Sequence, residues 1–285
     1  MKPLPPSFLS KAAATAAVAA FLAFPSFQAR AVVIAADSFS VNGTRTAGSS
    51  VSGTLTETGN LSWSGGSQWV LFGDETNGYM GTKGSGSAGI GIPFNFATYQ
   101  SSGEIATLSA SIAYRKDSNT GRWFALGFGS NTTVGGLPSA VYLQVNVYTG
   151  TWELMSAANS GGDLPSGTIT GINFASSTPV TYSLTYDNSR ATVLDISING
   201  TSVLSNYTFA SAPAEIQSAG FWGQLPYNTQ TGVVFDNLEL TVVPEPGTSA
   251  LFIGGAAVAC LGVAFRRKRK SAAAPRGSQD ARLSA

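Results

Sequence analysis

Carboxylates and aromatic rings are the side chains that could do chemistry here, because the 285-residue chain has no histidine and one cysteine, Cys260. Without histidine it lacks the usual general base, the usual zinc ligand and any Ser-His-Asp or Cys-His site. Glycoside hydrolysis stays open, since two carboxylates across a cleft suffice for it. The acids after Asp37 are scattered: Glu57, Asp74, Glu75, Glu104, Asp117, Glu153, Asp163, Asp187, Asp195, Glu215, Asp236 and Glu239. We therefore predict no catalytic residues and a protein that is not an enzyme.

Carbohydrate binding is the second chemistry that these residues allow, because aromatic faces stack on sugar rings while polar side chains bond to the hydroxyl groups. Trp152 follows a predicted turn and Trp222 precedes a predicted loop, so we expect both rings to be partly exposed. Together with Tyr227 they are the candidate sugar-binding residues. Trp123 lies in an apolar stretch and is expected in the core. The alternative is that all these rings simply fill the core.

No cofactor is predicted, and a structural calcium ion is left open. Calcium needs six to eight oxygen ligands, and the sequence has no contiguous calcium-binding loop. Asp74, Asp163 and Asp187 could each contribute a ligand from separate loops.

The charge is distributed unevenly. From Asp37 to Val242 there are 6 Lys and Arg residues against 13 Asp and Glu residues, so this body is acidic. Phosphate binding requires clustered cations, so nucleic acid is not an expected partner. The one cysteine allows no internal disulfide, and the body must be held together by its apolar core.

The most distinctive stretch lies near the C-terminus. An uncharged apolar run, Thr248 to Phe265, is 18 residues long, close to the ~20 that a membrane-spanning helix needs. It is preceded by Val243-Pro244-Glu245-Pro246. It is followed by five cations that favour the cytoplasmic side and set the orientation: Arg266, Arg267, Lys268, Arg269 and Lys270. We predict a transmembrane helix at 248–265, with the body outside and residues 271–285 as a disordered cytoplasmic tail.

This order of prolines, apolar span and basic cluster over residues 243–270 resembles the PEP-CTERM sorting signal of Gram-negative bacteria. The resemblance implies that an exosortase-like enzyme in the membrane recognises Pro244, Glu245 and Pro246 and cuts near them. The protein would then be a transient resident of the inner membrane that is delivered to the cell surface or the extracellular matrix. The alternative is an ordinary anchor that is never cut.

The N-terminus carries the pattern of a secretory signal peptide. A short apolar stretch, Ala12 to Phe24, is followed by small residues at Ala29-Arg30-Ala31 and at Ile34-Ala35-Ala36, either of which suits signal peptidase. We place the signal peptide at residues 1–36. A permanent N-terminal anchor is the alternative, although 13 apolar residues are short for a span.

The body at 37–242 is predicted to be all-β. Gly, Ser, Thr and Asn separate short runs in which apolar residues recur at every second position, as in half-buried strands. The clearest runs are Leu108-Ala110-Ile112-Tyr114, Val141-Leu143-Val145-Val147, Val180-Tyr182-Leu184-Tyr186 and Leu194-Ile196-Ile198. Asn199-Gly200 predicts a type I′ hairpin turn, and we expect about a dozen antiparallel strands in one two-sheet sandwich. Two tandem sandwiches are the alternative.

The body also resembles the concanavalin-like and laminin-G-like jelly rolls of exported bacterial proteins. The resemblance lies in Asp37-Ser38-Phe39 at the start, the aromatic strand at 121–128 and Val234 to Leu240 at the end. It implies that the first and last strands pair, bringing Phe39 near Phe235 or Leu238. The retaining glucanases of this fold carry a Glu-x-Asp-x-x-Glu strand, and this sequence has none.

Together these patterns predict an exported, non-catalytic surface or matrix protein with a structural or adhesive role in extracellular polysaccharide. The alternative is a lectin-like carbohydrate-binding module or a glycan hydrolase on the same fold.

Overall fold

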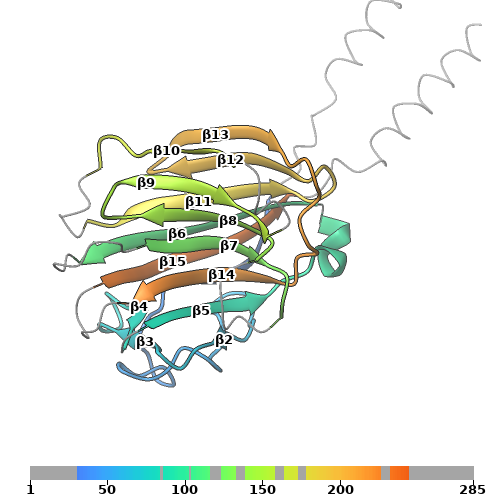
Figure 1. Cartoon of the computed structure of the whole chain (residues 1–285). Helices are drawn as coiled ribbons and strands as arrows, with labels where there is room; N and C mark the ends of the chain where they lie inside the picture. The colour runs from blue at the N-terminus through green and yellow to red at the C-terminus, as the bar shows by residue number, and fades with distance from the viewer. Residues whose placement is uncertain are drawn as a thin grey trace, which may run out of the picture. The chain divides into compact units, whose positions relative to one another are not determined.

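The computed structural model describes residues 31–83, 86–102, 104–115, 123–132, 139–157, 164–172, 178–225 and 232–243. Within these ranges the chain forms fifteen strands and one 3₁₀ segment, η1 (Phe96–Ser102). The strands build two antiparallel sheets that face each other (Figure 1). The all-β sandwich predicted from the two-residue periodicity is confirmed, with more strands than expected because several are only two to four residues long.

The first sheet has eight strands in the order β13-β12-β11-β6-β15-β4-β3, and β1 pairs with β15 beside this path. Its strands are β1 (Val32–Asp37), β3 (Trp69–Phe72), β4 (Tyr79–Thr82), β6 (Ile105–Arg115), β11 (Val180–Asp187), β12 (Thr192–Ile198), β13 (Thr201–Thr208) and β15 (Gly232–Val243).

The second sheet has seven strands in the order β10-β9-β8-β7-β14-β5-β2. Its strands are β2 (Ser64–Gly65), β5 (Gly86–Pro93), β7 (Trp123–Gly129), β8 (Val141–Asn146), β9 (Thr151–Met155), β10 (Ser166–Thr168) and β14 (Ser218–Leu225).

Aromatic rings join the two sheets at the centre of the core. Phe221 of the second sheet lies 4.5 Å, centroid to centroid, from Phe235 of the first. Phe124 packs edge-on against Tyr182 across the same gap at 5.0 Å. Burial leaves the neutral phenol of Tyr182 favoured and raises its pKa well above the usual value. Ring contacts between facing strands therefore hold the two sheets together, as disulfides do in many exported domains.

The strand patterns read from the sequence match the structure closely. Val180, Tyr182, Leu184 and Tyr186 all point into the core from β11. In β12 the expected alternation fails at one place. Thr185 of β11 pairs with Asp195 and Tyr186 pairs with Val193, so the register shifts and Leu194 between them has no partner on β11. Val193 is buried there and Leu194 is only half-buried.

The predicted turn between β12 and β13 is confirmed. Asn199 and Gly200 both have positive φ angles, 52° and 76°, as a type I′ turn requires.

The first and last strands pair, as the jelly-roll resemblance implies. In the register of β1 and β15, Val32 lies opposite Val242 and Asp37 lies opposite Leu238. Strand β6 occupies the other edge of β15 along its whole length. The strand that leads into the predicted sorting signal is therefore an interior strand of the sheet.

The predicted signal peptide up to residue 30, the span at 248–265, the basic cluster at 266–270 and the tail lie outside the described residues. Among the residues that are described, no helix combines the length and apolar character needed to cross a membrane.

Candidate functional site

A buried ionic network lies where β1 leaves the first sheet. Asp37 is 2% exposed and accepts four hydrogen bonds. Two come from Arg45 (Nη1 to Oδ1, 2.8 Å; Nη2 to Oδ2, 2.9 Å). The others come from the indole N–H of Trp63 at 2.7 Å and the backbone N–H of Phe39 at 2.8 Å. A buried carboxylate is tolerated only with such partners, so the network fixes the chain after β1.

Glu57 extends this network to the surface. Its carboxylate accepts bonds from Ser38 N, Ser38 Oγ and Ser40 N at 2.8–3.1 Å, and from Arg45 Nη1 at 3.3 Å. Burial opposes its ionisation, but the bonds from Ser38 and Ser40 and the charge of Arg45 together outweigh burial and lower the pKa of Glu57. The two serines are thereby held in one position.

These serines form one wall of a polar pocket of about 400 Å³. Nearly all of its lining side chains carry a hydroxyl, amide or carboxylate group. The lining residues are Ser38, Ser40, Thr76, Asn77, Gly78, Tyr79, Asp236 and Asn237. We call it the polar pocket.

Another part of the lining comes from a turn organised by Asp74. Its Oδ1 accepts bonds from Thr76 N, Thr76 Oγ1 and Asn77 N at 2.8–2.9 Å. These bonds, the side-chain hydroxyl of Thr76 first, lower the pKa of Asp74. Gly78 then packs directly on the neighbouring backbone, because an added Cβ would lie 2.2 Å from the carbonyl oxygen of Phe39. Both segments are thus held in place by bonds and contacts within the protein itself.

The last two lining residues come from an irregularity in β15. The register with β6 shifts between Asp236 and Glu239, and Asn237 adopts a φ of 48°. Such a bulge redirects side chains, and here it presents Asp236 and Asn237 to the pocket. Burial, together with the negative charges of Glu57 and Asp37, raises the pKa of Asp236 against the opposing bond from Asn237 N.

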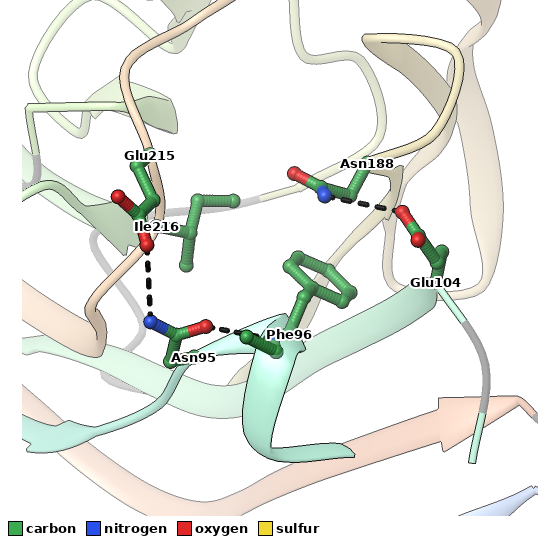
Figure 2. A pocket seen from close by; sticks show the side chains of 7 residues that line it. Asn95, Phe96, Glu104, Asn188, Glu215 and Ile216 are labelled. Carbon is green, nitrogen blue, oxygen red and sulfur yellow. Dashed lines mark hydrogen bonds between the residues drawn. The ribbon is translucent and has the colours of Figure 1, made fainter. Parts of the chain in front are cut away.

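A second, smaller pocket of about 130 Å³ lies elsewhere on the sandwich, between η1, the turn after β11 and the segment before β14 (Figure 2). Glu104 accepts a bond from Asn188 at 3.2 Å, and Glu215 accepts one from Asn95 at 3.2 Å. Figure 2 shows the two carboxylates on opposite sides, with Phe96 between them. We call it the Glu104–Glu215 pocket.

The predicted exposure of two candidate rings is wrong. Trp152 is 6% exposed and Trp222 is 7% exposed. Trp152 and Leu154 share the inner face of β9, and the Trp152 ring covers Gly167 of the paired strand β10. A buried ring offers little face to a sugar, so this burial disfavours a stacking role, which stays a prediction. Tyr227 lies outside the described residues, as do Pro244, Glu245 and Pro246.

Trp222 and Trp123 form a separate cluster on the outer face of the second sheet. Their rings stack at 3.8 Å and pack with Ala125 and Tyr142. Trp123 was expected in the core, but it is the half-buried member of this pair. Alternation in β7 explains the difference, since Phe124 and Leu126 take the inner face.

The sequence did not single out the polar pocket. Two local signals mark it in hindsight: the Asp74-Glu75-Thr76-Asn77-Gly78 turn, and the polar pair at 236–237 that interrupts the alternation of the last strand. The meeting of these segments depends on the pairing of β1, β4 and β15, which no local pattern contains.

No group of three or more Asp, Glu, His or Cys side chains in the described ranges is arranged to hold a metal ion. Asp163, one of the residues considered for calcium, lies outside those ranges, and calcium stays a prediction.

Solved structures with a similar arrangement include the carbohydrate recognition domain of Emp47p, at 11% identity, 73% of this chain, 98% of that chain and a TM-score of 0.47. A second is the Ca²⁺/Man₂-bound exoplasmic/lumenal domain of VIP36, at 10% identity, 68% of this chain, 86% of that chain and a TM-score of 0.46. A third is a protein of unknown function with a galectin-like fold from Bacillus subtilis, at 14% identity, 70% of this chain, 99% of that chain and a TM-score of 0.45. These similarities are too low to transfer any residue's role.

A search of curated proteins found no match to this sequence. A family model, however, matches the end of the last strand and the segment after it. Residues 242–269 match the PEP-CTERM protein-sorting motif, and the chain therefore carries this motif behind a jelly-roll sandwich.

Proposed function

We propose that the chain is an exported, non-catalytic surface protein whose sandwich binds extracellular polysaccharide through the polar pocket. The sorting motif at 242–269 supports export through a membrane-anchored intermediate that an exosortase-like enzyme processes. The observation that carries the binding proposal is the polar pocket, whose walls are held by hydrogen bonds within the protein itself.

The chemistry of the lining suits a polyhydroxylated ligand. Each sugar hydroxyl both donates and accepts a hydrogen bond, and the pocket offers hydroxyls from Ser38 and Ser40, amides from Asn77 and Asn237, and the carboxyl group of Asp236. An apolar ligand would instead cover these groups without adding any hydrogen bond, at a cost of roughly 1–3 kcal/mol for each group left unsatisfied. The volume of about 400 Å³ falls within the ~300–1,000 Å³ typical of small-molecule sites.

A glycoside hydrolase is the second candidate function, and the Glu104–Glu215 pocket is the observation that favours it. Two carboxylates facing each other are the minimum equipment for this reaction. Against it, the volume of about 130 Å³ is well below the usual range for a ligand site. Both carboxylates are also already bonded to asparagine amides.

Titration calorimetry with soluble fragments of the host's own extracellular polysaccharide tests the binding proposal. Asn77→Ala and Asn237→Gly should each lower the affinity about tenfold, which corresponds to one lost hydrogen bond of about 1.4 kcal/mol. Glycine at 237 retains the positive φ angle. Asn188→Ala is the matched control, because it removes an amide from the other pocket.

Two outcomes would contradict the proposal. If Asn188→Ala weakens binding while Asn77→Ala does not, the ligand occupies the Glu104–Glu215 pocket. If the protein releases reducing ends from the polysaccharide, and Glu104→Gln and Glu215→Gln abolish the release, the protein is a hydrolase.

A further inference from the structure

We infer that signal peptidase cuts between Ala31 and Val32, so that strand β1 stays in the mature protein. The inference deepens the proposed function, because it rests on export. The sequence offers two cuts, after Ala31 and after Ala36, which differ by the segment 32–36. The structure gives this segment a place in the fold.

Strand β1 is bonded on both of its edges. On one edge it pairs with β15 over Val32 to Asp37. On the other, the backbone of Ala36 exchanges hydrogen bonds with that of Thr58 at 3.3 and 2.9 Å. A cut after Ala36 would remove five of the six residues of β1 and leave the end of β15 with an unpaired edge just before the sorting motif.

The residues around β1 also pack closely against it. Ala35 is fully buried and Ile34 is 8% exposed. Gly59, with a φ of 88°, packs so closely on the backbone of Ile34 that an added Cβ would lie 2.0 Å from its carbonyl oxygen. Removing residues 32–36 would leave this glycine facing an empty space in the sheet.

The charge of the new N-terminus separates the two cuts further. A cut after Ala36 would place an ammonium group on Asp37, which is 2% exposed and bonded to the guanidinium of Arg45. The carboxylate of Asp37 is already neutralised by Arg45, so a second cation buried at this place would lack a counter-charge of its own and is disfavoured. A cut after Ala31 places the ammonium group on Val32, which is 43% exposed.

The residues before each cut agree with this choice. Signal peptidase prefers small residues one and three positions before the cut. Ala31 and Ala29 satisfy both positions, whereas a cut after Ala36 would have Ile34 at the third.

The test is N-terminal sequencing and intact-mass measurement of the full chain exported from its own host. Wild type should begin at Val32. Ala31→Val should abolish that N-terminus, because a β-branched residue replaces the small one before the cut. Ala36→Val is the matched control and should still begin at Val32, since valine suits a strand.

A wild-type protein that begins at Asp37, or one that is exported with residues 1–31 still attached, would overturn the inference and leave the proposed export standing. An Ala31→Val chain that still begins at Val32 would overturn it too. A wild-type chain that stays uncut inside the cell would overturn the proposed export and the inference together.

Discussion

Arg45 and Asp37 form a buried bidentate ion pair, in which Nη1 lies 2.8 Å from Oδ1 and Nη2 lies 2.9 Å from Oδ2. The pair joins the end of β1 to a loop eight residues later, and through Glu57 it reaches the serines of the polar pocket. The serines that line the polar pocket therefore depend on a buried ion pair that is not itself part of the lining.

Arg45→Met should lower the free energy of unfolding by about 3–5 kcal/mol, because it leaves the Asp37 carboxylate buried without its counter-charge. Urea unfolding measures this loss. Arg190→Met is the comparison: Asp187 is also buried, at 2%, but the Arg190 side chain is 75% exposed and Asp187 keeps its bonds from Ser189 Oγ and Arg190 N, so we expect a smaller loss of about 1 kcal/mol or less. Equal small effects in both variants would mean that Asp37 is solvated.

Glu57→Gln should make the protein less stable at neutral pH by about 1–3 kcal/mol, because charge-assisted bonds to Ser38 and Ser40 are lost. The folded pKa of Glu57 is below its ordinary value of 4.5. Its contribution is therefore complete above pH 4.5 and disappears as the pH falls through the lowered folded pKa. Thermal unfolding from pH 7 to pH 3 should show the two proteins converging in acid. A gap that is constant with pH would rule out the charged form as the cause.

Asp236→Asn should make the protein more stable at neutral pH, which is the opposite of the effect expected for Glu57→Gln. The folded pKa of Asp236 is above its ordinary value of 3.8, so its charge destabilises the fold at neutral pH. Replacing it should raise Tm at pH 7, and this gain should vanish as the pH falls below 3.8, where the acid is neutral in both states. A variant that is less stable than wild type at pH 7 would show that the carboxylate makes bonds that asparagine cannot replace.

Gly59→Ala should destabilise the protein by about 1–3 kcal/mol more than Gly171→Ala. Both glycines have positive φ angles, 88° and 77°, so both substitutions strain the backbone by roughly 1–2 kcal/mol. Only at Gly59 does the added methyl group collide with a neighbouring strand, and overpacking adds a further ~1–3 kcal/mol. Chemical unfolding of the pair isolates this collision. Equal losses would indicate that β1 can move aside.

Replacing Pro244, Glu245 and Pro246 together by alanine should retain the protein in the inner membrane at a greater mass than the wild-type surface form. The physical reason is that a processing enzyme which recognises these residues loses its recognition element, whereas the apolar run at 248–265 is unchanged. Intact-mass measurement of each cell fraction decides the question. An uncut wild-type protein would instead identify a lasting anchor.

Much of the sandwich could be predicted from periodicity, because strands with one buried face repeat every two residues. The runs in β6, β8 and β11 are examples, and Asn199-Gly200 specifies its own turn. The positions of the bulges were not predictable: Leu194 looks like an ordinary strand residue, and the polar pair at 236–237 interrupts the alternation without showing how the ladder shifts beside it.

The polar pocket was even less accessible to sequence reasoning. Asp236 lies about 200 residues from Ser38; the jelly-roll resemblance implied the pairing of β1 with β15 that brings their segments together, but not the turn at Asp74 or the bulge that complete the lining. The rings of Trp152 and Trp222 show a related limit, since a position next to a turn does not say which face of the strand a side chain takes.

The pairing of β1 with β15 also fixes an order of events. In the proposed export route strand β15 would be the last to leave the translocation channel, yet it pairs with β6 on one edge and with both β1 and β4 on the other. Contacts so distant in sequence form slowly, and here they cannot form at all until the whole body has been delivered. On this route the sheet would be completed from its middle only after its last strand has emerged, so an enzyme that processes the sorting motif directly after that strand would meet a protein that has only just folded.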